Sequence, residues 1–253
     1  MNHYKPQPRH EKKQHEGPVW IYGRHAVLAA LKNHKRNLHR LVITENAAAW
    51  LGESHKVPGD AESLKPHQID KLLQPGAVHQ GVAGLFDDLP RARLKAACSA
   101  DNPRPVVVLD QVTDPQNIGA IMRVAAGFKA QALIVQDRRT PPLAGALAKA
   151  AAGTLETLPV IKAVNISRSL EALQEMGFRT AGLAGEGAVP LPDYDHTGPL
   201  AIVMGAEGKG LRQGVRGHCD DLVSIPLAED VESLNVATAA AVALYAVTSQ
   251  LPS

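Results

Sequence analysis

The alternation of apolar and polar positions divides the chain into two α/β units. In residues 18–89, short apolar runs alternate with stretches whose apolar positions recur at helical spacing. From residue 105 onward the apolar runs become more continuous, as in PVVVLD at 105–110, which is typical of a strand buried on both faces. Because strands alternate with helices there, the sheet should be mostly parallel. The pattern therefore predicts an α/β fold with a small unit at 18–89 and a larger one at 105–253.

The same spacing predicts the individual elements. In the small unit we expect strands at 19–22, 38–44 and 81–86, and helices at 24–33, 45–54 and 66–74. In the larger unit we expect strands at 106–110, 131–135, 157–161, 178–184, 200–204 and 221–226, and helices from residue 115, at 142–151, 166–176 and 210–216, and from about residue 233. Residues 1–17 are polar and basic without a period, which favours a disordered tail. Residues 90–104 indicate a linker with one helical turn.

Composition narrows the class of protein. Apolar residues make up 45% of the 253, enough for a buried core, and no apolar run is long enough to cross a bilayer. The first residues lack the apolar stretch of a signal peptide. Cys98 and Cys219 lie far apart, which suits a reducing cytoplasm and disfavours a disulfide framework or a zinc site. We therefore expect a cytoplasmic protein that has no membrane segment and binds no metal.

The charge is unevenly distributed along the chain. Residues 1–45 hold nine Lys and Arg against three Asp and Glu, whereas residues 106–253 hold eleven basic against fifteen acidic residues. A basic front end on a neutral-to-acidic body favours a polyanionic partner that approaches from the N-terminal side. A solubilising tail explains the charge alone equally well.

Three loops of unusual composition lie at the ends of strands in the larger unit. DQVTDPQNIGAIMR follows the strand at 106–110, and IPLAEDVESLNVATAAA follows the strand at about 222–225, where Ser233 fits a helix N-cap. The third is VMGAEGKGLR at 203–212, at the end of the strand at 200–204. Ligands of an open parallel sheet bind beyond the carboxyl ends of its strands. Taken singly, each loop has an ordinary structural explanation, but together they favour a functional site.

The loop VMGAEGKGLR has the glycines of a phosphate-binding turn but carries Glu207 in its middle. A carboxylate repels phosphate, so the glycines are better explained by the close approach of backbone to another ligand. We expect Glu207 to lie near a cation, and the guanidinium of Arg123 is the first candidate.

These stretches carry a resemblance to a known family. DPQNIGAIMR, IVMGAEGKGLR and SIPLAEDVESLNVATAAAVALY resemble, in the same order, the three motifs of the SpoU-type (TrmH-like) RNA 2′-O-ribose methyltransferases. The N-terminal IYGRHAVLAALKN resembles the L30e-like RNA-binding domain of the branch that methylates a guanosine of 23S ribosomal RNA. The resemblance covers roughly residues 19–250. It implies a SPOUT methyltransferase domain with a C-terminal trefoil knot, a homodimer, and S-adenosylmethionine as cofactor.

The resemblance also implies roles for individual residues. Arg123 takes the position of the family's proposed base; a charged arginine can instead clamp the ribose or its phosphate. The polar residues expected to orient Arg123 and the nucleotide are Asn117, Glu207, Ser233 and Asn235. The cofactor site is expected to be lined by Gly205, Ile225 and Leu234, with Leu227, Ala184 and Gly185 nearby. In the small domain, Arg24 is expected to contact RNA.

Some positions differ from the family pattern, and other functions compete with the one implied. KAAAGT at 149–154 has Ala151 and Thr154 where the family has serine and alanine, yet the named polar residues are all present. A tRNA 2′-O-ribose methyltransferase is the alternative within the class. A non-catalytic rRNA-binding protein is the alternative outside it, disfavoured by the intact polar set. A Rossmann dehydrogenase is excluded because no G-x-G-x-x-G follows the strand at 106–110.

Overall fold

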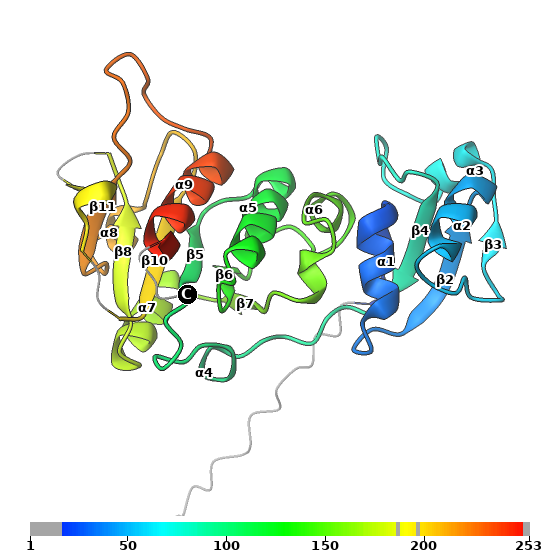
Figure 1. The fold of residues 1–253 in the computed structure, drawn as a ribbon, viewed down its shortest axis with the longest axis horizontal. Coiled ribbons are helices and arrows are strands. Elements are labelled where there is room, and N and C mark those ends of the chain that lie inside the picture. Colours follow the sequence, from blue (N-terminus) through cyan, green and yellow to red (C-terminus); the bar gives the residue numbers. More distant parts are fainter. Residues whose placement is uncertain (1–16, 186–187, 196–197, 250–253) are drawn as a thin grey trace, which may run out of the picture.

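The computed structural model describes residues 17–185, 188–195 and 198–249, and nearly all of the predicted basic tail lies outside them. The chain forms a small domain and a large domain joined by a linker (Figure 1). The small domain consists of β1 (Val19–Tyr22), α1 (Arg24–Lys32), β2 (Leu38–Ile43), α2 (Glu45–Gly52), β3 (Glu62–Ser63), α3 (Pro66–Asp70) and β4 (Val82–Phe86). The linker contains α4 (Leu94–Ala97), the single helical turn that the sequence predicts.

The large domain contains the remaining elements. They are β5 (Val106–Asp110), α5 (Pro115–Gly127), β6 (Leu133–Gln136), α6 (Gly145–Ala150), the 3-10 helix η1 (Thr154–Glu156), β7 (Val160–Ala163), α7 (Ile166–Glu175), β8 (Arg179–Leu183), β9 (Val189–Pro190), the 3-10 helix η2 (Leu191–Asp193), β10 (Leu200–Gly205), α8 (Gln213–Arg216), β11 (Asp221–Ser224) and α9 (Val236–Ser249). Every strand pair of its sheet is parallel, as the alternation of elements predicts.

The order of the strands fixes where a ligand can bind. In the large sheet the order is β7-β6-β5-β10-β8-β11-β9, so the chain continues from β5 to β6 in one direction and from β10 to β11 in the other, past β8. The two strands are neighbours, and Gly205 at the end of β10 lies opposite Asp110 at the end of β5. A crevice beyond the carboxyl ends is expected at such a reversal of strand order. The small sheet, in the order β1-β4-β2-β3, is mainly antiparallel and has no such point.

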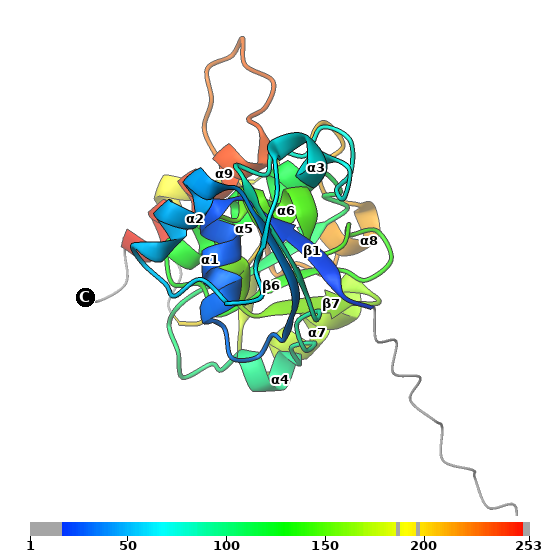
Figure 2. The same cartoon turned by 90° about the vertical axis from the view of Figure 1, so that its right-hand side faces the viewer.

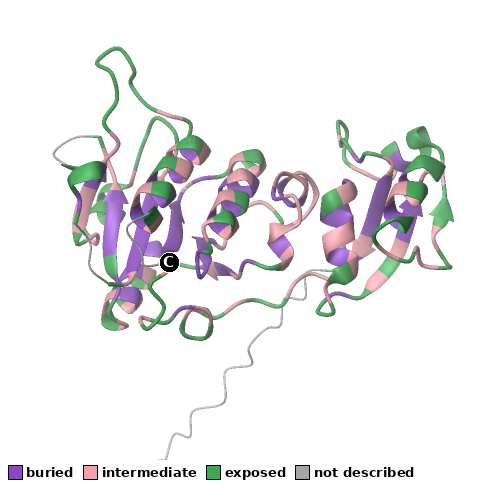
Figure 3. Cartoon of the chain, viewed as in Figure 1, coloured by how far each residue is buried: buried purple, intermediate pink, exposed green. Residues whose placement is uncertain are grey.

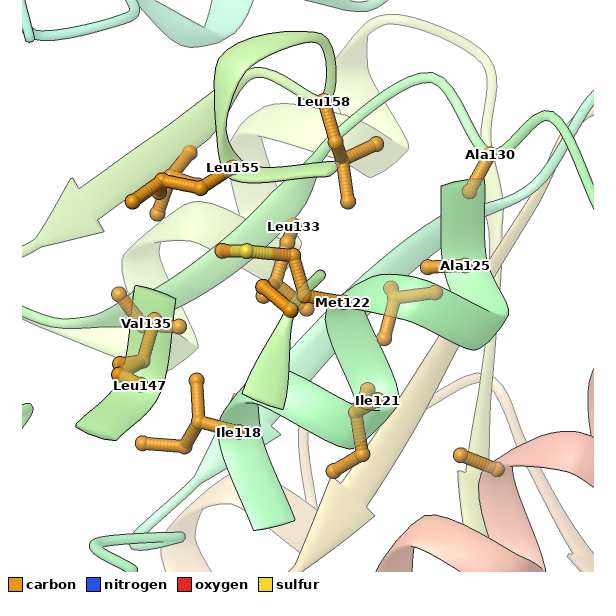
Figure 4. Packing of buried hydrophobic residues seen from close by; sticks show 14 of the residues in the cluster. Ile118, Ile121, Met122, Ala125, Ala130, Leu133, Val135, Leu147, Leu155 and Leu158 are labelled. Carbon is orange, nitrogen blue, oxygen red and sulfur yellow. The ribbon is translucent and has the colours of Figure 1, made fainter. Parts of the chain in front are cut away.

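Apolar packing places α5 at the centre of the molecule. Its residues Ile118, Ile121 and Met122 are buried and face the strands and the segment that carries Leu147 and Leu155 (Figure 4). Strands β5 and β10 are buried almost throughout, whereas the outer faces of the helices are exposed (Figure 3). This explains why the continuous apolar run at 106–110 is predicted correctly as a central strand.

Several boundaries differ from the predicted ones for local reasons. The strand expected at 157–161 begins only at Val160, because residues 154–156 form a 3-10 turn. The helix expected at 210–216 begins at Gln213, because the glycines before it belong to a tight turn. The last helix begins at Val236 and not near residue 233. Strands β3 and β9 have two residues each, too few to produce a period in the sequence.

Candidate active site at the ends of β5 and β10

The loop after β10 closes on itself over Gly205. The backbone N–H of Gly210 donates to the carbonyl of Ala206 at 2.8 Å, so the chain turns back directly after the strand. A Cβ on Gly205 would lie 2.1 Å from the carbonyl carbon of Gly210, which no side chain can occupy. Gly208 and Gly210 have φ of 72° and 61°, where glycine is strongly favoured. The glycines therefore shape the turn itself.

An ion pair between Arg212 and the buried Asp110 ties this loop to the end of β5. Asp110 is fully buried, and its carboxylate accepts from the backbone N–H of Arg212 at 3.0 Å and from Nη2 of the same residue at 2.6 Å. Nε of Arg212 donates to both oxygens of Asp110, at 2.9 and 3.2 Å. Sequence reasoning missed this pair. The signal was an aspartate at the end of an otherwise apolar strand, a place where a buried charge requires a partner.

Glu207, in the middle of the loop, binds amides instead of an arginine. Its Oε1 accepts from Nδ2 of Asn117 at 3.1 Å, from Nδ2 of Asn235 and from the backbone N–H of Val236 at 3.2 Å. The two asparagines also contact each other, because Nδ2 of Asn235 donates to Oδ1 of Asn117 at 3.0 Å. The expected pair between Glu207 and Arg123 is therefore wrong. One carboxylate oxygen instead joins three segments that lie far apart in the sequence.

The carboxylate lies where two helices begin. Asp114 caps α5 by accepting from the N–H groups of Gln116 and Asn117, and Asn235 caps α9 by accepting from those of Ala237 and Thr238. The expected N-cap role of Ser233 is therefore wrong. The N-terminus of a helix carries partial positive charge and favours an anion. Glu207 supplies that anion from within the protein, which explains a carboxylate in a turn that otherwise suits phosphate.

A cavity of about 510 Å³ lies beside this loop. Its lining includes the residues that the resemblance assigns to the cofactor, namely Ala184, Gly185, Gly205, Ile225, Leu227 and Leu234, together with Glu207 and Ser233. These residues follow β8, β10 and β11, whose ends are adjacent in the sheet. Its walls combine apolar side chains with a backbone exposed by glycines, so they suit a ligand with an apolar or flat surface that is held by main-chain groups.

Arg123 lies apart from the other predicted polar residues. It is exposed on α5, six residues after Asn117 and so about 9 Å further along the helix axis. In the part of the chain that the structure describes, its side chain makes no hydrogen bond or ion pair. The guanidinium is thus free to bind a ligand at the surface, whereas Asn117 and Asn235 are held by Glu207.

Arg24 lies in a different setting, at the first position of α1 in the small domain. Its guanidinium carbon lies 5.4 Å from the centroid of the Trp50 ring, and its Nε is buried with no hydrogen-bond partner among the described residues. Next to it is an open cavity of about 640 Å³, whose lining also includes Asn46 and Gln80. Val78, on the same rim, is 59% exposed. The groups on this rim can contact a large ligand.

The remaining reactive groups do not form a second site. Burial raises the pKa of the Cys98 thiol to about 11, and burial with the nearby carboxylates of Asp220 and Asp110 raises that of Cys219 to about 12, so neither is a thiolate at neutral pH. Within residues 17–185, 188–195 and 198–249, no group of three His, Cys, Asp or Glu side chains could hold a metal ion. None of the described helices is long and apolar enough to span a membrane.

The sequence and the fold of this chain are both similar to those of known methyltransferases. A curated relative from Pseudomonas syringae pv. tomato, named 23S rRNA (guanosine-2′-O-)-methyltransferase RlmB, is 37% identical over 240 residues, which is 89% of this chain and 93% of the relative. The crystal structure of the SpoU methyltransferase AviRb from Streptomyces viridochromogenes, in complex with AdoMet, matches with a TM-score of 0.77 and 25% identity over 92% of this chain and 90% of AviRb.

A third match covers only part of the chain. A structure that describes 2′-OH methylation of C/U34 on tRNA matches with a TM-score of 0.53 and 26% identity, over 59% of this chain and 97% of its own. Residues 20–92 match the family described as RNA 2′-O ribose methyltransferase substrate binding. Residues 104–245, which contain β5, the loop after β10 and the start of α9, match the SpoU rRNA Methylase family. The chain belongs to the SpoU rRNA methylase family.

Proposed function

We propose that this protein transfers a methyl group from S-adenosylmethionine to the ribose 2′-oxygen of a guanosine in 23S ribosomal RNA. The observation that carries the proposal is the convergence of three motif loops on one carboxylate, beside a cavity at the ends of β5 and β10. Relatives named for this reaction align with nearly the whole chain. The arrangement has one place for a small cofactor and an exposed arginine on the adjoining helix.

The cavity fits S-adenosylmethionine in shape and chemistry. The loop backbone at Gly210 packs directly against Gly205, so this wall of the cavity is built from main chain, against which flat groups can lie. When bound, S-adenosylmethionine supplies a methyl group on a sulfonium whose leaving group is a neutral thioether. The residues proposed to hold it are Gly205, Ile225 and Leu234, with Leu227, Ala184 and Gly185 at the edge. Most of these contacts would come from the main chain, which is why apolar residues can serve.

The protein's own part in the reaction is to place the ribose. The 2′-oxygen forms the new bond to carbon as the bond from that carbon to sulfur breaks, and the hydroxyl proton must leave. Arg123 keeps its charge, as arginines do in proteins, so it holds the ribose or its phosphate while a phosphate oxygen or water takes the proton. Asn117 and Asn235, fixed by Glu207, give the start of α5 a defined position. Such positioning contributes up to about 7–11 kcal/mol in favourable reactions.

We further propose two features of the fold. The first is that the connection from β11 to α9 is threaded as a trefoil knot. Supporting this, the connection projects from the body of the large domain (Figures 1 and 2), and its end returns to the loop after β10, where Val236 donates to Glu207. The second is that the small domain is L30e-like. Its four-stranded sheet with helices α1, α2 and α3, and its match to the substrate-binding family, support that assignment.

We also propose that the protein is a cytoplasmic homodimer that pairs through α9. Tyr245 and Val242 on this helix are 66% and 39% exposed, although the helix is otherwise apolar. Large apolar side chains that are exposed together favour a protein partner. Sedimentation or light scattering of the wild type and of Tyr245→Asp tests this: a dimer that the substitution converts to a monomer supports the proposal, and a monomeric wild type refutes it.

Ribosomal RNA is favoured over transfer RNA by the small domain. The relatives that carry the ribosomal name align over both domains, whereas the tRNA-related structure matches only 59% of the chain. The experiment that decides is a map of 2′-O-methylation across 23S and transfer RNA with and without the protein. A lost site in 23S RNA supports the proposal, and a lost tRNA site favours the alternative. S-adenosylmethionine binding by calorimetry tests the non-catalytic alternative, which predicts none.

A further inference from the structure

The segment of α6 and η1, residues 145–156, connects the small domain to the helix that carries Arg123. It lies between α1 and α5 in Figure 1, and it contacts β1 and α1 on one side and α5 on the other. Buried residues of both domains, such as Val27 of α1 and Leu155 of η1, belong to one continuous hydrophobic cluster. The two domains therefore share a core through this segment.

Close backbone contacts on both sides leave the segment little freedom. Gly153 has φ of 95°, and a Cβ there would lie 2.8 Å from Cβ of Ala29 in α1. On the other side, a Cβ on Gly119 of α5 would lie 2.5 Å from Cβ of Ala150. Interiors packed this closely transmit displacements from one element to the next. A shift of the small domain would therefore reach α5.

A buried ion pair fastens the segment to the small domain. Nε of Arg36 donates to Oε2 of Glu156 at 2.8 Å, and the two side chains are 0% and 5% exposed. The same carboxylate oxygen accepts from Nδ2 of Asn33 at 2.7 Å, and Nη1 of Arg36 donates to the carbonyl of Asp87 at 2.8 Å. Glu156 thus meets both the end of α1 and, through Arg36, the end of β4.

We propose that Glu156 is a positioning residue: it holds the RNA-binding domain in one orientation against α5, and so sets the geometry with which both domains contact a single RNA. This inference rests on the proposed function. The linker at 90–104 could by itself span roughly 50 Å when extended, so it does not fix the domain. With the domain docked, its orientation is settled before RNA binds. Without docking, ordering the domain opposes RNA binding and raises the KM for RNA.

The test combines a distance with two binding readouts. Glu156→Gln keeps the size of the side chain but leaves the Arg36 charge buried without a counter-charge, which is strongly unfavourable. Spin labels are placed in the small domain at Ser54→Cys and in the large domain at Glu175→Cys, with Cys98 and Cys219 replaced by alanine. Double electron–electron resonance then reports the distance between the two domains. With labelled chains diluted in unlabelled protein, so that a dimer carries at most one labelled chain, we expect one narrow distance in the otherwise wild-type protein and a broad distribution in Glu156→Gln. The KM for unmodified 23S RNA transcript should rise about tenfold or more, with S-adenosylmethionine affinity changed less than twofold.

Two further variants separate positioning from folding. Glu62→Gln breaks the Arg40–Glu62 pair, which has the same 2.8 Å contact but is exposed and lies within the small domain; all three readouts should stay at wild-type values. Arg36→Met with Glu156→Leu removes both charges, and apolar residues of similar volume often replace a buried pair without loss. This double variant should recover the narrow distance and bring the KM within about threefold of wild type.

Each other outcome contradicts the proposal. A broad distribution of distances in the wild type shows that the domains are not docked. A broad distance in Glu156→Gln with an unchanged KM shows that docking does not position the RNA. A raised KM with an unchanged distance, or a double variant that docks without recovering KM, assigns Glu156 another role. If the wild type methylates no RNA, the proposed function fails, while the distances still report whether the Glu156 contact docks the domains.

Discussion

The large domain gathers its polar side chains around one oxygen atom, whereas the small domain spreads them around an open rim. In the large domain, Asn117 and Asn235 both bond to Glu207, and Asp110 is satisfied by Arg212. In the small domain, the buried Nε of Arg24 has no partner in the described part of the chain. The difference follows from the sheets. Parallel strands bring several loops to one edge, whereas an antiparallel sheet sends its loops to opposite ends.

This contrast suits two kinds of ligand. A small cofactor is held best by a cavity formed in advance, and groups that already bond to one another keep its shape. A long polyanion gains much of its affinity from phosphate contacts and adapts to exposed cations. Arg123 does not fit this contrast, because it is in the large domain yet its side chain makes no hydrogen bond or ion pair within the described part of the chain.

Replacing Arg123 should cause the largest loss. Arg123→Ala is expected to slow methyl transfer to RNA by about 10³-fold or more, since the ribose loses the cation that orients it. Arg123→Lys should also fail, because lysine offers a point charge and no planar fork. Single-turnover methylation at saturating cofactor gives the rate. Cofactor affinity and thermal unfolding serve as controls, and both should stay unchanged because the side chain is exposed. A rate within tenfold of wild type would remove Arg123 from the site.

Gly205→Ala should have the next largest effect, on cofactor affinity. The added Cβ would lie 2.1 Å from the carbonyl carbon of Gly210, so the loop cannot close as it does in the wild type. We expect S-adenosylmethionine affinity to fall about 10²-fold, measured by calorimetry. Gly208→Ala is the matched control in the same loop: it has φ of 72° but open space around it, so it costs about 1 kcal/mol of conformational strain, or roughly fivefold. Equal losses in the two variants would mean that strain, and not the close approach, governs binding.

Two substitutions of Glu207 distinguish its role as a hydrogen-bond acceptor from its role as a negative charge. Glu207→Gln can keep an oxygen for both asparagines and for the N–H of Val236, but it loses the charge that faces two helix N-termini, worth about 0.3–1 kcal/mol at each. We expect methyl transfer to fall about tenfold in Glu207→Gln and about 10²-fold in Glu207→Ala. Single-turnover rates measure this. If either variant loses cofactor affinity and keeps its rate at saturation, Glu207 is a cofactor ligand instead.

Periodicity and strand ends were enough to predict most of the fold, and the reason is physical. The apolar run at 106–110 predicts a buried strand because burial on both faces leaves it no polar position. The 3.6-residue period and Pro115 predict the start of α5 correctly. The two-residue strands β3 and β9 could not be predicted, because two residues carry no period and their pairing depends on neighbours that are distant in sequence.

The candidate site was predicted as a set of residues but not as a set of contacts. The resemblance to the family indicated Asn117, Glu207 and Asn235, yet their mutual bonds depend on how three strand ends align, which the order of motifs along the chain does not contain. For the same reason Ser233 was expected to be the cap: it matches the composition of a cap, and only the backbone path shows that Asn235 takes the position. The Asp110–Arg212 pair spans 102 positions, so the local sequence marks Asp110 as a charge in need of a partner but does not indicate which residue the partner is.

Replacing Arg24 should give the smallest effect, and it tests the other half of the contrast. If the small domain binds RNA through exposed cations, Arg24→Ala should weaken RNA binding about tenfold without changing cofactor affinity. The slope of log affinity against log salt should fall by about one, because one phosphate contact and its released counterion are lost. Filter binding of 23S RNA transcript over a range of salt measures both quantities.

Arg40→Ala is the matched control, because Arg40 is also a partly exposed arginine of the small domain but is already paired with Glu62. The Glu62 carboxylate already offsets the charge of Arg40, so Arg40 attracts a phosphate weakly. Removing it should leave both the RNA affinity and the salt slope nearly unchanged. Loss of the Arg24–Trp50 contact should lower stability by only about 0.5–1 kcal/mol, so the protein stays folded. A weaker affinity with an unchanged slope would mean that Arg24 contacts a base. The rim around Arg24 would then recognise the base sequence of the RNA. The small domain would in that case not be a purely electrostatic surface, in contrast to the preformed cavity of the large domain.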